Sequence, residues 1–403
     1  MDESSSWKAE ATRLLCANAH SFDLEDFPKI NYDISQLGAN GRCEDRYLHR
    51  TLPSAGADGK DWLAWAVFDG HGGPQTADCL TRNLLFFVSH HLSHFKKSCT
   101  NGYFPNRLIK QALTNAFLDC DKQILKNAVE ALTSMEDLPH RIKKVQPAIS
   151  GSCALLCLYD PTTSTMHTAC TGDSRAVLGQ QNSDGSWETF ALSEDQKPKS
   201  QREIDLLSQK HPGENHIFRH ERLQGLLAIT RAFGDAKLKW NLDIQKEMHK
   251  NFGFTSTINP RHYHTPPYLT AEPVIVQARI NPQKACFCVM ATDGLWDNMS
   301  SPQCVNLVAE WVKCEEKKAA ESEEHDTFDF SRVLEGLEQS FVEQRTTVQD
   351  DNAAVHLIRN ALGGNQHELV AGRLAAEPPF ARNVRDDITV QVIFFNKEEN
   401  GGR

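Results

Sequence analysis

Apolar runs along the chain come in two lengths, and the lengths predict different elements. Short runs bounded by turn residues predict strands over 61–69, 153–160, 166–173, 175–180, 285–294 and 388–395. Longer segments with helical apolar spacing predict helices after Pro74, over 108–132, at 302–314 and near 331–345. The three strands within 153–180 follow one another across short turns, which favours an antiparallel meander. Hairpins interspersed with helices predict an α+β fold of antiparallel sheet with packed helices, not a doubly wound parallel sheet.

Three stretches of mixed or charged sequence predict loops or insertions: 133–148, 237–268 and 314–328. None has the composition of a linker, so we expect one domain over 30–396, with an N-terminal extension at 1–29 and a tail at 397–403. The 237–268 stretch is more aromatic than a solvated loop requires, which predicts a role in substrate or partner choice. Its aromatic residues include Trp240, Phe252, Phe254 and Tyr263.

Charge and composition exclude several partner classes. The 403 residues carry a formal net charge of −10, so no basic surface for nucleic acid or an anionic membrane is expected. No run approaches the roughly 20 apolar residues of a membrane span. The twelve cysteines are scattered through apolar patterns, which predicts buried thiols in a reducing compartment. The acidic start, "MDESSSWKAEATRLL", shows no signal-peptide or transit-peptide pattern.

Acidic residues stand at the ends of several predicted strands. Asp69, Asp173 and Asp293 each end an apolar run, and Asp386 precedes another. Because the end of one antiparallel strand lies beside the start of its neighbour, these carboxylates could converge at one sheet edge. Glu44 and Asp45, in "NGRCEDR", add two more acidic side chains before a short segment.

Converging carboxylates repel one another, and divalent cations relieve that repulsion. All-oxygen ligands select hard ions, so the pattern predicts Mg²⁺ or Mn²⁺. Gly70 and Gly294 directly follow two of the aspartates, and the missing Cβ would let the backbone approach a metal or its waters. A single aspartate after a strand is more often a turn former; four such motifs together favour a site.

The motifs then resemble a known family. "NGRCEDR", "VFDGHGG", "GSCALL", "CTGDSRAVLG", "LAITRAFGD", "LTAEPVI", "ATDGLWDNM" and "RDDITVQVI" occur in the order and spacing of the metal-dependent type 2C serine/threonine protein phosphatases. The resemblance covers about residues 30–396. It implies a four-layer α-β-β-α sandwich of two antiparallel sheets flanked by helices, with a two-metal site at one edge. Within the family, "FGDAKLKWNLDIQKE", "YHTPPYLTAEP" and "DDNAAVHLIRNA" look most like the pyruvate dehydrogenase phosphatases.

The resemblance also implies roles for the acidic residues. Asp69 would bridge two Mg²⁺ or Mn²⁺ ions, the Gly70 carbonyl would bind one, and Asp293 and Asp386 would hold the other. Four further carboxylates would act through water or at a looser third metal, namely Glu44, Asp45, Asp173 and Asp297.

Catalysis, by the same resemblance, is hydrolysis of phosphoserine by a metal-activated water. His71 would be the general acid that protonates the leaving alkoxide. Many members place an arginine five residues before the position of Asp45 to grip the substrate phosphate. This chain has Asn40 there and Arg42 three residues before Asp45, so either side chain could serve.

The implied substrate is the phosphorylated pyruvate dehydrogenase complex, with docking to a lipoyl domain and a mitochondrial location. One alternative is a type 2C phosphatase of the cytoplasm acting on another signalling phosphoprotein. A non-catalytic, phosphoprotein-binding pseudophosphatase would typically have lost Asp69, Asp293 or Asp386, and all three are present. A Mg²⁺-dependent nuclease would usually show a basic surface.

Overall fold

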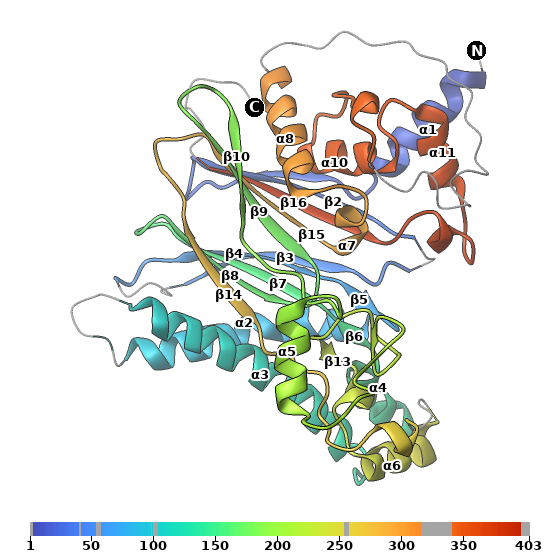
Figure 1. The fold of residues 1–403 in the computed structure, drawn as a ribbon. Coiled ribbons are helices and arrows are strands. Elements are labelled where there is room, and N and C mark those ends of the chain that lie inside the picture. The colour runs from blue at the N-terminus through green and yellow to red at the C-terminus, as the bar shows by residue number, and fades with distance from the viewer. Residues whose placement is uncertain are drawn as a thin grey trace. The chain divides into compact units, whose positions relative to one another are not determined.

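The computed structural model describes residues 3–39, 42–53, 58–97, 99, 104–253, 258–315 and 341–395. The chain divides into two compact units. The terminal unit comprises Met1–Asp45, Arg175–Leu192 and Arg279–Arg403, and the central unit comprises Arg46–Ser174 and Ser193–Ala278. Each unit contains antiparallel sheet flanked by helices, so the predicted α+β class is confirmed (Figure 1).

The terminal unit is built on a six-stranded sheet in the order β1-β2-β16-β15-β9-β10. The strands are β1 (His20–Asp23), β2 (Ile30–Leu37), β9 (Arg175–Gln181), β10 (Trp187–Ala191), β15 (Cys286–Ala291) and β16 (Ile388–Phe395). The two apolar runs β15 and β16, far apart in sequence, pair with Val289 opposite Val392. Both strands are buried almost throughout, which explains their continuous apolar sequence.

Helices of this unit pack on one face of the sheet. The helices among its described residues are α1 (Glu3–Cys16), α7 (Asp293–Trp296), α8 (Ser301–Glu315), α10 (Ala353–Leu362) and α11 (His367–Ala375), with one-turn 3₁₀ helices η3 (Glu343–Arg345) and η4 (Ala381–Asn383). Of these, α1, α7, α8 and α10 contact its strands. Figure 1 shows α8 and α10 on the sheet, where α8 contacts β9 and β10 and α10 contacts β2 and β16. Asn352 caps α10 by accepting from the amides of Ala354 and Val355.

The predicted extension at 1–29 contributes to this unit. Helix α1 packs on α10 and α11. Its Ala11 and Leu15 are buried in the apolar cluster that also contains core residues of α8, α10, β15 and β16. The buried Arg359 of α10 donates to Thr12 and forms an ion pair with Asp350. The first helix is therefore held by apolar and polar contacts to residues near the other end of the chain.

The central unit has a five-stranded sheet in the order β14-β8-β7-β4-β3, a three-stranded sheet β13-β6-β5 and a hairpin β11-β12. The larger sheet contains β3 (Arg46–Leu52), β4 (Trp62–Phe68), β7 (Ala154–Asp160), β8 (Thr165–Thr171) and β14 (Val274–Arg279). The smaller elements are β5 (Gly70–His71), β6 (Gly151–Ser152), β11 (Phe218–Arg219), β12 (Arg222–Leu223) and β13 (Phe233–Gly234).

Two long helices, α2 (Gln75–Lys96) and α3 (Asn106–Glu130), pack against each other, and α2 also contacts β3 and β4. Pro74 is the N-cap of α2, where its missing amide costs no hydrogen bond. The other helices are α4 (Leu138–Ile149), α5 (Gln201–Lys210), α6 (Leu242–Phe252), η1 (Ala236–Leu238) and η2 (Pro260–His262). None of the helices in the described ranges combines the length and apolarity that crossing a membrane requires.

The predicted meander over 153–180 is wrong. β7 and β8 form a hairpin of the central sheet, but the next strand, β9, pairs with β10 and β15 in the terminal unit. A short turn between apolar runs does not determine the partner of the second run, because pairing depends on long-range contacts. Of the two neighbours of β9, β10 lies about ten residues further along the chain and β15 about 110 residues further.

The stretches expected as loops contain helices. Residues 133–148 hold most of α4, which begins after Asp137 accepts from the His140 amide. Residues 237–268 hold α6, which has an Asn241 cap and a left-handed Gly253 at its end. The third stretch, 314–328, lies outside the described residues from 316 onward, as does most of the helix expected near 331–345.

Three of the four aromatic residues named above in 237–268 are described, and each packs within the central unit. Trp240 and Tyr263 are 6% and 3% exposed, and the Tyr263 hydroxyl donates to the Trp240 carbonyl at 2.8 Å. Phe252 lies under the Arg141 guanidinium, which is 5.2 Å from the ring centre. Packing therefore accounts for these three side chains, while Phe254 lies outside the described residues. A role of 237–268 in substrate or partner choice stays a prediction.

The cysteines are all free thiols, and most are buried as expected. Cys16, at the end of α1, is exposed and corrects that expectation.

A buried ion pair ties α3 to the segment that follows β13. Lys239 donates to both oxygens of Asp121 at 2.8 and 2.7 Å, and the side chains are only 4% and 9% exposed. Asp121 also accepts from the Gly234 amide at 2.9 Å. Burial raises the pKa of Asp121 and the Lys239 charge opposes that shift, so the carboxylate depends on its partner.

We expect Lys239→Met to lower the free energy of unfolding by about 3–5 kcal/mol, because it leaves a buried carboxylate without its counter-charge. The matched control is Lys246→Met, which removes the exposed Lys246–Asp243 pair on α6 and should change stability little. Urea unfolding of both variants measures the difference. Equal stabilities would show that the Asp121–Lys239 pair does not hold this segment.

Candidate active site

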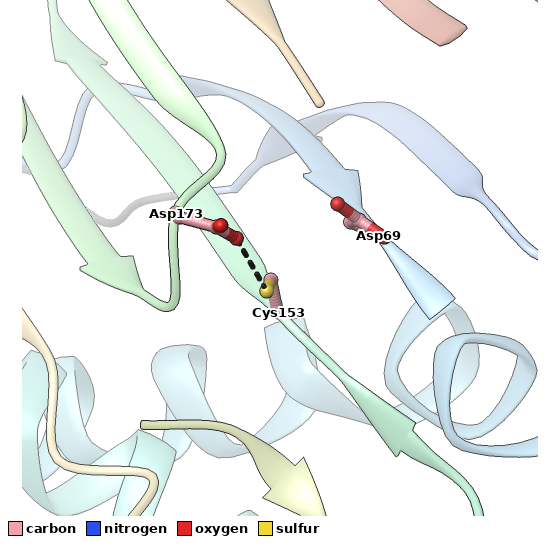
Figure 2. A group of neighbouring side chains, drawn as sticks. All are labelled: Asp69, Cys153 and Asp173. Atoms are coloured by element: carbon pink, nitrogen blue, oxygen red, sulfur yellow. Dashed lines mark hydrogen bonds between the residues drawn. The ribbon is translucent and has the colours of Figure 1, made fainter. Parts of the chain in front are cut away.

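Asp69 stands at the end of β4, whose seven residues are all buried. The Asp69 carbonyl accepts from the Cys153 amide at 2.8 Å. This hydrogen bond keeps the backbone at Asp69 paired with the segment that leads into β7. Ligand atoms of Asp69, Cys153 and Asp173 all lie within 4.8 Å of one another. Figure 2 shows these three side chains, which come from the ends of separate strands. The central unit therefore brings together two of the predicted acidic residues.

Cys153 is a member of this group that the sequence did not assign to the site. Its Sγ lies 3.4 Å from Asp173 Oδ1, and Gly172 makes room because a Cβ there would come within 2.2 Å of the sulfur. The sequence pattern predicts only a packing side chain here, and the thiol is 2% exposed. Nothing in the local sequence marks it, because its relation to Asp173 depends on the β7-β8 pairing.

Asp173 is buried between the positive charge of Lys197 and the carboxylate of Asp69. Burial raises its pKa, while Lys197, whose Nζ is 3.2 Å from Oδ2, acts in the opposite direction. A carboxylate that is 4% exposed and held near a second carboxylate is a costly arrangement without further positive charge. The donor set therefore fits a divalent cation.

His71, in β5, lies beside a partner from a distant part of the chain. Its Nε2 is 2.6 Å from Oδ2 of Asp235, which follows β13. The three short strands place these residues together, with His71 paired to Gly151 and Gly151 paired to Gly234. Sequence reasoning missed Asp235, although it lies in the quoted "LAITRAFGD" motif, because no local pattern links it to His71.

The terminal unit gathers a second group of carboxylates where β15 ends and β16 begins. Asp293 is the first residue of α7, just after β15, and Asp386 lies two residues before β16. Burial acts to lower the pKa of Arg382, but nearby carboxylates raise it above its ordinary value. These carboxylates belong to Asp386, Asp387, Glu44 and Asp293.

Asp45 is the most deeply buried of this group, at 1% exposed. Its Oδ2 accepts from the hydroxyls of Thr292 and Thr389 at 2.9 and 2.8 Å. Burial, followed by the charge of Asp387, raises the pKa of Asp45 well above its ordinary value. The concentration of negative charge is therefore strong enough to favour either protonation or a bound cation.

The twin aspartates 386 and 387 have different surroundings. Asp387 is 4% exposed, and its two oxygens accept from the backbone amides of Ala39 and Glu44 at 2.6 and 2.7 Å. Asp386 keeps 35% of its side chain exposed and has an ion pair of 3.3 Å with Arg382. Burial raises the pKa of Asp386 and Arg382 partly offsets it. Asp387 thus holds the backbone at Ala39 and at Glu44, and Asp386 has the more exposed carboxylate.

Of the other predicted positions, four are described and one is not. Asp297 is exposed at the end of α7, and Glu44 and Arg42 are half-buried and exposed, respectively. Asn40 lies outside the described residues. The lack of a side chain at Gly294 serves packing, and not the expected approach to a metal. A Cβ there would come within 2.2 Å of the Asp387 carbonyl. The glycine accommodates close backbone packing within the unit.

Carboxylates gathered at strand ends suit a metal-dependent hydrolase, and comparison with known proteins gives the family. Residues 38–326 match the family Protein phosphatase 2C. The chain belongs to this family and is a protein serine/threonine phosphatase. The family uses Mg²⁺ or Mn²⁺, and the carboxylates described above are suitable ligands.

Individual relatives extend the similarity over most of the chain. A protein phosphatase 2C homolog of Schizosaccharomyces pombe is 39% identical over 92% of this chain and 81% of its own length. The mitochondrial [pyruvate dehydrogenase [acetyl-transferring]]-phosphatase 1 of Saccharomyces cerevisiae is 33% identical over 91% of this chain and 68% of its length. A solved serine-threonine phosphatase 2C from Toxoplasma gondii has the same fold, with a TM-score of 0.53 and 18% identity over 94% of this chain and 99% of that one.

The different surroundings of the twin aspartates give a paired prediction. Asp387→Asn should lower the free energy of unfolding by about 2–4 kcal/mol, because an amide cannot accept from both buried N–H groups. Asp386→Asn should leave the melting temperature nearly unchanged but weaken Mn²⁺ binding at least about tenfold, because it removes a charged ligand atom.

Calorimetric titration with Mn²⁺ and thermal unfolding of both variants test this pair. A stable Asp387→Asn protein that has lost Mn²⁺ affinity, beside an unaffected Asp386→Asn protein, would reverse the assignment of the two residues.

Proposed function

We propose that this phosphatase acts in mitochondria on phosphoserine of the pyruvate dehydrogenase complex. The observation that carries the proposal is the 33% identity over 91% of the chain to a relative named for that activity and location. The relative with 39% identity carries only the family's name, so the substrate is the part of the proposal that needs a direct test.

We propose two metal ions with the ligands expected from the resemblance. In the central unit these are the Asp69 carboxylate and the Gly70 carbonyl; in the terminal unit they are Asp293 and Asp386. Glu44 and Asp45 are proposed to act through water, and Asp173 and Asp297 at a third ion. The raised pKa values of Asp45, Asp173 and Asp386 support cation binding near each, since burial and neighbouring negative charge both disfavour their ionised forms.

When bound, such ions lower the pKa of water enough to supply a nucleophile at neutral pH and polarise the phosphoryl oxygens. His71 is proposed to donate a proton to the serine oxygen as its bond to phosphorus breaks. Its ring is 24% exposed and thus reachable by a substrate. Arg42, which is exposed, or Asn40 is proposed to hold the substrate phosphate by hydrogen bonds.

The substrate proposal predicts a preference that can be measured directly. With Mg²⁺ present, the protein should dephosphorylate phosphorylated pyruvate dehydrogenase complex faster than an unrelated phosphoprotein of similar size, by at least about tenfold in kcat/KM. Phosphate release is followed with each substrate, with and without Ca²⁺ and with and without an added free lipoyl domain as competitor.

Asp69→Asn is the inactive control, because it removes a proposed metal ligand. Equal rates on the two phosphoproteins would assign the enzyme to another substrate, such as a cytoplasmic signalling protein. Binding of the phosphorylated complex without any turnover would instead indicate a pseudophosphatase. Inhibition by the free lipoyl domain would support docking to that domain.

The proposed acid role of His71 predicts a dependence on the leaving group. His71→Gln should slow phosphoserine peptide hydrolysis by about two to four orders of magnitude and nitrophenyl phosphate hydrolysis much less. An alkoxide needs a proton to depart, whereas nitrophenolate does not. Measuring kcat on both substrates, with a Mn²⁺ titration and a melting curve, tests this.

Similar slowing of the two substrates, together with a lower melting temperature, would show that His71 only packs the turn after β4.

A further inference from the structure

The contact between His71 and Asp235 carries a role for an acidic residue that binds no metal in the scheme above. We propose that Asp235 is a positioning residue, which holds the His71 imidazole through Nε2 and thereby makes Nδ1 the nitrogen that serves the leaving oxygen. The inference rests on the proposed acid role of His71. Its physical basis is the 2.6 Å separation between Nε2 and Asp235 Oδ2, with side chains 24% and 14% exposed.

Asp235 is held in an unusual backbone conformation. Its φ is +45°, in the left-handed region, which costs a residue other than glycine about 1 kcal/mol or more. The conformation is maintained by hydrogen bonds on both sides, since the Asp235 amide donates to the Ser150 carbonyl and the Leu238 amide donates to the Asp235 carbonyl, both at 2.9 Å. Strained residues that their surroundings enforce are concentrated at functional sites.

The residue before Asp235 is equally constrained. Gly234 has a φ of +68°, and a Cβ there would come within 2.2 Å of the Ser150 carbonyl. Its amide donates to Asp121, the buried carboxylate paired with Lys239. The segment that carries Asp235 is therefore attached to α3 by an ion pair and to β6 by strand pairing.

Gly151, the central residue of the three short strands, leaves the space in which the two side chains meet. A Cβ at this position would lie 2.1 Å from both His71 Nε2 and Asp235 Oδ2. Any other residue would force the pair apart. The histidine, the aspartate and the glycine thus form one arrangement that no single local sequence motif specifies.

The hydrogen bond determines what each ring nitrogen can do. A carboxylate is an acceptor, so Nε2 carries a hydrogen and donates it to Asp235. Rotation of the ring about its χ2 angle would break this bond, so the orientation is fixed. Any proton that the ring gives to a leaving alkoxide must then come from Nδ1. Serine hydrolases also use a carboxylate to orient a catalytic imidazole, although there the carboxylate binds Nδ1 and Nε2 does the chemistry.

The test uses Asp235→Asn, which preserves shape but replaces the charged acceptor with an amide that can present either a donor or an acceptor. We expect kcat for a phosphoserine peptide to fall by about tenfold to a hundredfold, the usual effect of losing an outer hydrogen-bond partner. Nitrophenyl phosphate hydrolysis should fall less than threefold, and Mn²⁺ affinity and melting temperature should be unchanged.

The matched control is Asp119→Asn. Asp119 and His91 form a second histidine–aspartate contact, of 2.9 Å, between α3 and α2, and neither residue belongs to the proposed site. This substitution should leave both activities at the wild-type level. Any loss shared by the two variants would reflect a general effect of removing an aspartate.

Coupling to His71 is the decisive measurement. If Asp235 acts only through the ring, His71→Gln combined with Asp235→Asn should be no slower on the phosphopeptide than His71→Gln alone. Side-chain ¹⁵N spectra, with His71 assigned by its absence in His71→Gln, should show Nε2 protonated in the wild type and a changed signal in Asp235→Asn. Gly151→Ala, which pushes the pair apart, should reproduce the substrate-dependent loss.

Several outcomes would overturn the proposal. They are equal losses on the two substrates, additive losses in the double variant, or a His71 spectrum unchanged by Asp235→Asn. Failure of the proposed function looks different, because the wild type would then release no phosphate from phosphopeptide, or His71→Gln would slow both substrates alike. If Asp235→Asn does not fold, the wild-type spectrum and the Gly151→Ala kinetics decide.

Discussion

Mutual repulsion among carboxylates at strand ends is the constraint around which both units are organised. In the terminal unit, Asp45 is almost fully buried and its pKa is raised by burial and by Asp387. Threonine hydroxyls at 292 and 389 satisfy one of its oxygens, but hydroxyls supply no positive charge. In the central unit, Lys197 offsets only part of the cost at Asp173. A fold that concentrates negative charge in this way is stabilised by cations.

Three glycines leave room for close contacts beside these functional groups. Gly294 admits the Asp387 carbonyl, Gly172 admits the Cys153 sulfur, and Gly151 admits the His71–Asp235 contact. A Cβ at any of the three positions would displace a neighbouring group that belongs to the site or helps to position it. These three glycines therefore act through packing inside each unit. For Gly294 this replaces the expected approach to a metal or its waters, while the Gly70 carbonyl remains a proposed ligand.

Sequence reasoning succeeded where a signal is local. The buried runs of β4, β7, β15 and β16 are continuous enough to be recognised, and the aspartates beside them follow from turn chemistry and family resemblance. It failed where the answer depends on pairing between distant segments. The partner of β9, the place of Cys153 beside Asp173, and the contact of Asp235 with His71 all depend on strand register. No periodicity within one segment contains that information.

Two pairs of chemically identical residues show why surroundings, more than residue type, determine function here. Asp386 and Asp387 are adjacent, yet one uses both oxygens on backbone amides while the other keeps a third of its side chain exposed. The His71–Asp235 and His91–Asp119 contacts are similar in length, yet Asp235 is 14% exposed and Asp119 is 49% exposed. A bond in water exchanges readily with solvent, so it orients little. The same bond between partly buried groups on a constrained backbone determines which ring nitrogen is available for chemistry.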